Sequence, residues 1–136
     1  MMLAVAALGI VFRRNWDCAA SIAIGVVLCA LGAVFGIAGA RALGRSRTAF
    51  PEPRETATLV RHGIYARVRH PLYTSVMLLS LGWGLIWGSW PACIVALLIA
   101  VFLNVKAKRE EIWLREKFPD YSAYQKQARR FFPWLY

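Results

Sequence analysis

Residues 72–105, with the sequence LYTSVMLLSLGWGLIWGSWPACIVALLIAVFLNV, contain no charged side chain and one break, at Gly88-Ser89-Trp90-Pro91. Glycine and proline this close together are typical of a tight turn. The break separates two apolar stretches, Leu72–Gly88 and Pro91–Val105. We predict that the two stretches form a helical hairpin, with interfacial tryptophans gathered near its turn.

Two more apolar stretches precede the hairpin. Cys18–Ala40 holds no charge and is long enough to cross a membrane, which takes about 20 apolar residues. Met1–Phe12 is shorter, and we expect it to form a partial or tilted span. Gly32 and Gly36 make a ridge of small residues that lets another helix approach closely. The same ridge also makes a homodimer plausible.

The composition is that of a membrane protein. Of the 136 residues, 59% are hydrophobic and the mean hydropathy is +0.47, yet the net charge is +10. The long apolar runs exclude a disordered basic tail and argue against a soluble protein that binds nucleic acid. The three cysteines are scattered through apolar segments without the spacing of metal ligands. We therefore predict neither a disulfide framework nor a metal site.

The positive charges predict the topology. Residues 41–70 carry seven Lys or Arg and the chain from Lys106 onward carries eight, whereas the link between the first two stretches carries two. Cytoplasmic segments of membrane proteins are enriched in Lys and Arg. We therefore predict an all-α, polytopic membrane helical bundle of three to four spans. The N-terminus, the long loop and a helical C-terminal segment should lie in the cytoplasm.

We expect one domain over residues 1–136. Its parts are N-terminal spans (1–40), a cytoplasmic loop with a cofactor motif (41–71), the hairpin (72–105) and a cytoplasmic tail (106–136). Lys106–Phe118 contains good helix formers and no breaker, so it should extend the fourth span. The aromatic and basic residues after Pro119 suit a segment that lies among lipid headgroups or folds over a site.

A dense group of His, Arg and Tyr lies where the third apolar stretch begins. It reads LVRHGIYARVRHPLY and spans Leu59–Tyr73. Pro71 suits the first turn of a helix, whose backbone donors would favour an anionic group. Gly63 permits a turn that brings Tyr65 close to Tyr73. A solvated cluster beside the membrane would explain the arginines, but explains less well the histidines, glycine and proline packed among them.

A second motif, KAKREEIWL, covers Lys106–Leu114. Lys106 and Glu110 are one helical turn apart, and an ordinary ion pair on a solvated face would account for them. The hairpin also anchors this segment beside the third stretch. Glu110 is therefore placed to lean over His70.

Together, HGIYARVRHPLYTS and KAKREEIWLREKFPDYSAYQKQARRFFPW resemble the isoprenylcysteine carboxyl methyltransferase and phospholipid methyltransferase families of integral membrane enzymes. The resemblance covers the chain from the long loop to its end and implies S-adenosylmethionine as cofactor. It assigns cofactor binding to Leu59, Val60, Tyr65, His70, Pro71, Leu72, Tyr73, Glu110 and Glu111. It assigns catalytic roles to Arg69 and Lys106.

The resemblance also implies what each group does. Glu110 would pair with the ammonium of the cofactor, while His70 and Arg69 would hold its carboxylate. A tyrosine of the first motif, or Trp113, would stack on adenine or face the sulfonium. Lys106 stands where the best-known members have an arginine tied to the substrate, and lysine lacks the planar bidentate fork. The implied reaction methylates a lipid-like or prenylcysteine-like acceptor, with carboxylate O-methylation favoured.

Two other functions are weighed against methyl transfer. NADPH-dependent membrane sterol reductases carry a similar Arg-His-Pro-x-Tyr element, but they are much longer and commonly have an acidic residue where this chain has Thr74 and Ser75. A basic membrane adaptor without enzymatic activity would leave the two paired motifs as coincidence. The partners that we expect are a lipophilic or prenylated substrate and membrane lipids, with no nucleic acid.

Overall fold

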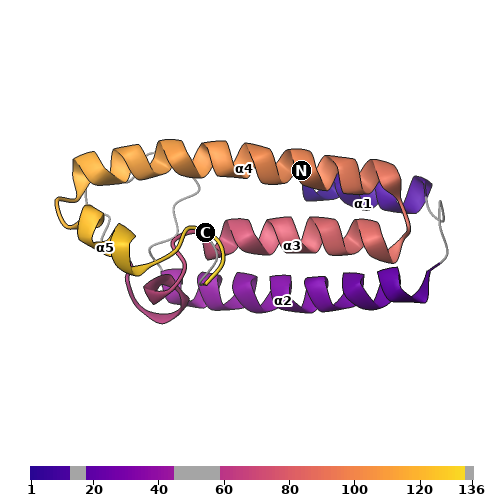
Figure 1. Cartoon of the computed structure of the whole chain (residues 1–136), viewed down its shortest axis with the longest axis horizontal. Coiled ribbons are helices and arrows are strands. Elements are labelled where there is room, and N and C mark those ends of the chain that lie inside the picture. The colour runs from indigo at the N-terminus through magenta and orange to yellow at the C-terminus, as the bar shows by residue number, and fades with distance from the viewer. Residues whose placement is uncertain (13–17, 45–58, 134–136) are drawn as a thin grey trace.

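The computed structural model describes residues 1–12, 18–44 and 59–133, and within these ranges its regular secondary structure is helical (Figure 1). The elements are α1 (Met2–Val11), α2 (Ala19–Leu43), the 3-10 helix η2 (Gly63–Ala66), α3 (Pro71–Ile86), α4 (Trp90–Lys117) and α5 (Tyr121–Gln127). The predicted all-α class is confirmed for this part of the chain. Residues 45–58 of the expected cytoplasmic loop and residues 134–136 at the end of the tail lie outside the described residues.

The predicted hairpin is formed by α3 and α4. The chain turns at Gly88, whose φ of 58° lies in the left-handed region that glycine adopts without strain. Ser89 then caps α4, because its hydroxyl accepts a hydrogen bond from the backbone N–H of Ala92 at 3.4 Å. The same hydroxyl donates to the Leu8 carbonyl at 3.1 Å, which fastens α1 to the turn.

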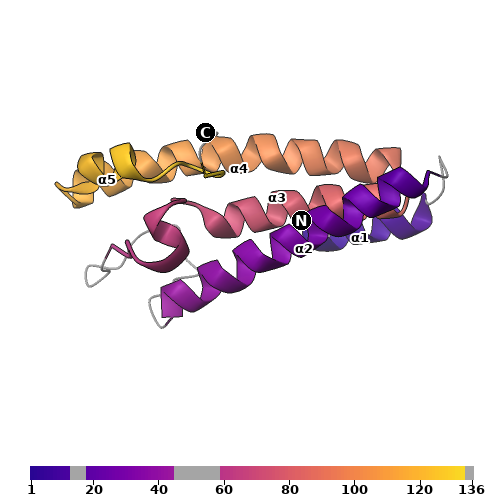
Figure 2. The same ribbon diagram turned by 60° about the horizontal axis from the view of Figure 1, so that its bottom comes forward.

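Helix α3 lies between α2 and α4 in both views of the ribbon (Figures 1 and 2). The approach of α2 is close, since a Cβ added to Gly25 would lie 2.7 Å from the carbonyl oxygen of Gly82. A Cβ on Gly32 or Gly36 would likewise meet residues of α3. The predicted packing role of the Gly32 and Gly36 ridge is therefore confirmed. Its partner is α3 of the same chain, so the ridge lends no support to a homodimer.

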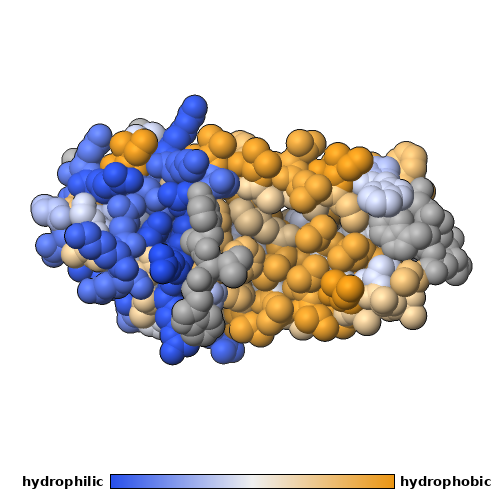
Figure 3. All heavy atoms as spheres, viewed as in Figure 1, coloured by the Kyte–Doolittle hydropathy of each residue, from blue (hydrophilic) through white to orange (hydrophobic). Residues whose placement is uncertain are grey.

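Two helices, α2 and α4, are long and apolar enough to cross a membrane, and α1 and α3 are apolar but shorter. Their outer faces expose large apolar side chains, among them Leu3, Val11, Val27, Val34, Leu97, Leu98 and Val101. Figure 3 shows an apolar band across the face in view, next to the hydrophilic end of the molecule. A surface of this extent fits contact with lipid. The number of spans stays a prediction.

Hydrophilic residues gather at one end of the molecule (Figure 3). We call this end the polar cap, and it comprises residues 59–70 and 106–133. Helix α4 contributes residues 106–117, which continue the helix beyond its apolar part as predicted. The cap is completed by η2 and α5.

Candidate functional site

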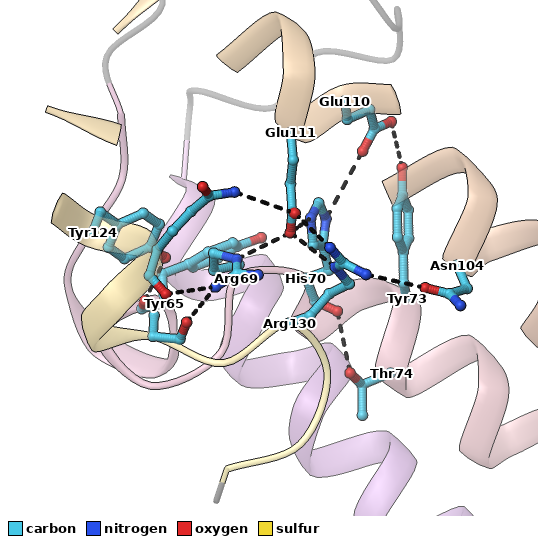
Figure 4. A network of polar contacts seen from close by, with 12 residues as sticks. Tyr65, Arg69, His70, Tyr73, Thr74, Asn104, Glu110, Glu111, Tyr124 and Arg130 are labelled. Atoms are coloured by element: carbon cyan, nitrogen blue, oxygen red, sulfur yellow. Dashed lines mark hydrogen bonds and ion pairs between the residues drawn. The ribbon is translucent and has the colours of Figure 1, made fainter. Parts of the chain in front are cut away.

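Three segments meet in the polar cap: the start of α3, the extension of α4 and the C-terminal return segment, residues 128–131 (Figure 4). The backbones of residues 67–70 and 129–130 share hydrogen bonds of 2.7–3.0 Å around a parallel bridge. The buried Thr74 hydroxyl lies 2.8 Å from the Phe131 carbonyl, to which it donates. The tail therefore folds over the first motif, one of the two arrangements expected from its composition.

Glu111 is the centre of the side-chain contacts, and it is 1% exposed. Its Oε1 accepts hydrogen bonds from Arg69 Nε at 3.0 Å and Arg130 Nε at 3.1 Å, and lies 3.3 Å from His70 Nε2. Its Oε2 accepts from Arg130 Nη2 at 2.8 Å and Gln125 Nε2 at 3.3 Å. The lone pairs of this carboxylate are thus used inside the protein.

The surroundings of Glu111 keep it ionised. Burial by itself opposes the charged form, but hydrogen bonds from His70 and Arg130 and the charge of Arg69 outweigh burial. Together they hold the pKa of the Glu111 carboxyl well below its ordinary value of 4.5. The carboxylate is therefore the counter-charge for two arginines that are themselves mostly buried.

The two arginines connect Glu111 to the rest of the cap. Arg69 Nη1 donates to the backbone carbonyls of Gln125 and Ala128, so this side chain closes the end of α5 onto the first motif. Arg130 Nη1 donates to Asn104 Oδ1 at 3.3 Å, which ties the return segment to the apolar part of α4. Fixed in this way, both arginines are structural bridges within the cap.

Glu110 has a different environment from its neighbour. Its side chain is 21% exposed, and its Oε1 accepts a hydrogen bond of 2.6 Å from the Tyr73 hydroxyl. Lys106 Nζ lies 3.8 Å from the same oxygen, which confirms the expected ion pair one turn apart. His70 Nδ1 lies 3.8 Å from Glu110 Oε2, so Glu110 does lean over His70. The Lys106 ammonium also lies 5.3 Å from the centroid of the Tyr73 ring.

Tyr65 is brought to the site by the turn that Gly63 was expected to permit. Gly63 has a φ of 62° and begins η2, which carries Tyr65. The Tyr65 carbonyl accepts a hydrogen bond from the Tyr124 hydroxyl. Burial raises the pKa of Tyr65 above its ordinary value, and burial raises the pKa of Tyr124 to about 12. Both phenols are therefore neutral hydrogen-bonding groups.

Four residues expected at the cofactor site also pack against the scaffold, and their role in cofactor binding stays a prediction. Pro71 and Leu72 face α2, where either would touch a Cβ placed on Gly39. Leu59 packs against the buried tyrosines of α5, and Val60 beside it is partly buried. Their side chains shape the entry into α3 and support the cap. Another expected residue, Trp113, is 43% exposed on α4, and no described contact joins it to the cluster.

Four polar residues of the cluster were not expected from the sequence: Thr74, Asn104, Gln125 and Arg130. All four contact Glu111 or a residue that binds it. One signal was available, because two consecutive glutamates on a helix point in different directions and a buried one needs cationic partners. Within the described ranges, no group of three or more His, Cys, Asp or Glu side chains forms a candidate metal site.

Comparison with known proteins identifies the family. The sequence profile of the phospholipid methyltransferases matches residues 20–121, three quarters of the chain. The chain belongs to the phospholipid methyltransferase family. This family of membrane methyltransferases is one of the two that the motifs resemble, and membership does not favour a reductase or an adaptor.

Two known proteins are similar to this member of the family. The structure of the eukaryotic intramembrane Ras methyltransferase ICMT, isoprenylcysteine carboxyl methyltransferase, has a TM-score of 0.73 and 27% sequence identity. The match covers 84% of this chain and 42% of that one. The cobalt-zinc-cadmium resistance protein CzcN of Cupriavidus metallidurans is 34% identical over 83 residues, 60% of this chain and 38% of CzcN. The chain thus spans about two fifths of the length of each.

Proposed function

We propose that this protein transfers a methyl group from S-adenosylmethionine to a lipid-like or prenylcysteine-like acceptor, with carboxylate O-methylation favoured. The family assignment supports the reaction class. The observation that carries the cofactor assignment is the contrast between the two glutamates. Glu111 is saturated by partners, whereas Glu110 is partly exposed at the edge of the same cluster. Glu110 is the carboxylate left to bind a ligand.

The corner around Glu110 fits a cationic ligand group. The chain's own Lys106 ammonium sits there, 3.8 Å from the carboxylate and 5.3 Å from the centre of the Tyr73 ring. An aromatic face beside a carboxylate stabilises a positive charge by about 0.5–2 kcal/mol beyond the ion pair. The ammonium and sulfonium of S-adenosylmethionine have the charge that this corner favours. Glu110 and Tyr73 are therefore the residues that we assign to hold the cofactor.

When bound, S-adenosylmethionine supplies an activated methyl group on its sulfonium. The protein contributes orientation, since methyl transfer to a nucleophilic acceptor needs no enzyme nucleophile. Lys106, 42% exposed, is assigned to the carboxylate of the acceptor. It lies next to the apolar part of α4, so an acceptor with a lipid tail would reach it from the bilayer. Binding of the cofactor then requires the Lys106 ammonium to turn away from Glu110 and Tyr73 toward the acceptor.

Two of the roles implied by the resemblance change in this proposal. Arg69 was expected to act in catalysis, and Glu111 was expected to bind the cofactor. The donors of Arg69 are directed at Glu111 and at backbone carbonyls of the tail, and its side chain is 10% exposed. Glu111 in turn is occupied by arginines. We assign both as positioning residues that hold the motifs together.

The proposal places the site on the cytoplasmic side of a multi-pass membrane protein. The polar cap contains Arg69, Lys106, Glu110 and Glu111, and Tyr73 lies directly beside it. Most of the Lys and Arg in the sequence fall in residues 41–70 and from Lys106 onward. Segments of this composition are typical of the cytoplasmic face. The cofactor would then enter from the cytoplasm and the acceptor from the lipid.

Cofactor binding by the detergent-purified protein tests the proposal. We expect wild type to bind S-adenosylmethionine and not NADPH. Glu110→Gln should weaken binding at least about tenfold, because it removes a charged hydrogen-bond partner worth about 1.5–3 kcal/mol. Glu116→Gln, an exposed site on the same helix, is the matched control and should bind as wild type does. Absence of binding by wild type, or equal binding by Glu110→Gln, would exclude the cofactor assignment.

The acceptor is tested separately with radiolabelled S-adenosylmethionine. Prenylcysteine analogues with a free carboxylate should be methylated, and the corresponding methyl esters should not. Lys106→Met, which keeps the aliphatic stem, should raise KM for the carboxylate acceptor more than it changes cofactor affinity. Transfer to an amine headgroup and not to the carboxylate would rule out the favoured acceptor while leaving methyl transfer intact.

A further inference from the structure

The imidazole of His70 lies between the two glutamates in an unequal arrangement (Figure 4). Its Nε2 is 3.3 Å from Glu111 Oε1, within hydrogen-bonding distance, whereas its Nδ1 is 3.8 Å from Glu110 Oε2. The ring stacks on Tyr73 with centroids 5.3 Å apart and planes 8° apart, and it meets Phe131 at 6.1 Å. The His70 side chain is 9% exposed. These contacts fix the plane of the ring.

The partners of Glu111 decide which nitrogen carries a proton. An ionised carboxylate only accepts hydrogen bonds. Glu111 is kept ionised by Arg69 and Arg130, whose Nε atoms both donate to the oxygen that faces His70. For the short contact to be a hydrogen bond, His70 Nε2 must therefore be the donor.

We propose that Glu111, clamped by Arg69 and Arg130, holds His70 as the tautomer protonated on Nε2. The lone pair of His70 Nδ1 is then left on the side of Glu110. Arg130, which comes from the return segment, is thereby a positioning residue for His70, with which it is connected through Glu111 and through a backbone hydrogen bond. A carboxylate that orients a histidine in this way fixes which ring nitrogen is available to a ligand.

The charged groups that face His70 come from three segments. On α4 they are Glu110, Glu111 and Lys106, in the first motif Arg69, and in the return segment Arg130; the Tyr73 hydroxyl of α3 is the neutral neighbour. The cations are directed at the glutamates and not at the ring. Nδ1 has no hydrogen-bond partner among the described residues, so it is the acceptor that the ring presents.

The tautomer changes the ligand group that His70 suits. A lone pair at Nδ1 beside the Glu110 carboxylate makes two adjacent acceptors, which match an ammonium that donates several hydrogen bonds. They do not match a carboxylate, the group that the sequence resemblance assigned to His70. This step rests on the proposed function, because it takes the ammonium of S-adenosylmethionine as the ligand. The tautomer itself does not depend on that function.

Nitrogen NMR of the imidazoles tests the tautomer. The chain has two histidines, so selective 15N-histidine labelling of the intact protein in detergent gives two ring systems. His62→Gln removes the exposed one and identifies His70. We expect a protonated, pyrrole-type shift at Nε2 of His70 and an unprotonated, pyridine-type shift at Nδ1. The reverse pattern, or protonation of both nitrogens at neutral pH, would overturn the proposal without any mutation in the cluster.

Paired arginine variants test the role of Arg130. Arg130→Gln should shift His70 toward a mixture of tautomers, because Glu111 loses its bidentate partner. Arg130→Lys, which restores one charged donor, should return the spectrum toward wild type. Arg129→Gln is the matched control, since Arg129 is exposed and bonds this region only through its backbone. An unchanged His70 spectrum in Arg130→Gln would overturn the role of Arg130.

Ligand titration of the same sample separates this inference from the proposed function. S-adenosylmethionine and its decarboxylated form, which keeps the ammonium, should both move the Nδ1 resonance of His70, whereas 5′-methylthioadenosine, which lacks both the ammonium and the carboxylate, should leave it unchanged. If S-adenosylmethionine binds and Nδ1 does not move, the acceptor role of His70 is wrong. If S-adenosylmethionine does not bind at all, the proposed function fails, and the tautomer is still decided by the spectrum of the free protein.

Discussion

Glu110 and Glu111 are consecutive residues of α4, yet the Glu111 carboxylate is buried inside the polar cap and the Glu110 carboxylate lies at its surface. Glu111 is 1% exposed and bonded to two arginines, whereas Glu110 is 21% exposed and bonded to Tyr73. Neighbours on a helix point about 100° apart, so two consecutive side chains can face different surroundings and serve different roles. In this chain, one glutamate assembles the cap and the other is available to a ligand.

Glutamine substitutions at Glu110 and Glu111 should have different effects on stability. Glu111→Gln leaves Arg69 and Arg130 without their counter-charge in a buried site, which costs about 3–5 kcal/mol in the free energy of unfolding. Glu110→Gln keeps an oxygen for the Tyr73 hydroxyl and loses only a partly exposed ion pair, so we expect a loss below about 1 kcal/mol. Denaturant unfolding in a mild detergent measures both. Similar losses in the two variants would contradict the division.

Acid should remove the stabilising effect of Glu111. Its pKa in the folded protein lies below the ordinary value of 4.5, so its contribution to stability is fully present above that value and is lost as the pH falls below it. We predict that the gap in stability between wild type and Glu111→Gln narrows as the pH is lowered from about 5 to about 3. Thermal unfolding in detergent across this range checks the prediction. A difference in stability that stays constant over this pH range would show that the charge of Glu111 does not stabilise the fold.

The hairpin and the residues of the first motif were predictable because their signals are local. An uncharged run with one turn specifies α3 and α4, and Pro71 marks the start of α3. The burial of Glu111 was also readable from helical spacing. It continues a buried stripe of α4 that includes Leu103 and Ala107, with spacings of four residues.

The contacts that hold the return segment against the first motif were not predictable from local sequence signals. Arg69 and Arg130 are far apart in sequence, and the tail shows only a mixture of aromatic and basic residues. That mixture suited lipid headgroups as well as a folded tail. Pairing over such a distance depends on long-range backbone contacts, here at Val68 and Arg129, which leave no periodic pattern.

The tail should loosen when its side-chain anchor is removed. The Thr74 hydroxyl is fully buried and donates to the Phe131 carbonyl, so Thr74→Val removes a buried hydrogen bond at a cost of about 1–3 kcal/mol. Hydrogen exchange should quicken at the amides of Arg129 and His70, which bond across the return segment. Thr74→Ser keeps the hydroxyl and should exchange as wild type does. Equal protection in the valine variant would mean that the backbone bridge suffices.

Close packing of α2 on α3 should make one glycine much less replaceable than another. A Cβ on Gly25 would meet the Gly82 carbonyl oxygen at 2.7 Å and the Ile86 side chain at 2.8 Å, so the helices must move apart. We expect Gly25→Ala to destabilise the protein by about 1–3 kcal/mol. Gly36→Ala meets the Ser75 hydroxyl, which can rotate, and should lose less. Unfolding in detergent compares them, and equal effects would contradict rigid contact at Gly25.

The polar cap should face the cytoplasm, because fifteen of the seventeen Lys and Arg in the sequence fall in the two segments that contain it, seven in residues 41–70 and eight from Lys106 onward. Two cysteine positions report the two ends. Cys18 is exposed at the start of α2, at the end of the bundle away from the cap, and Ser122 is exposed on α5 within it.

A maleimide that does not cross membranes should label Cys18 in intact cells. In a Cys18→Ser background, Ser122→Cys should react only after the cells are permeabilised. Cys29 and Cys93 lie within the apolar helices and are partly or fully buried, so they should react slowly in both conditions. Labelling of Ser122→Cys from outside would reverse the orientation, and it would also remove the supply of cytoplasmic S-adenosylmethionine on which the proposed function depends.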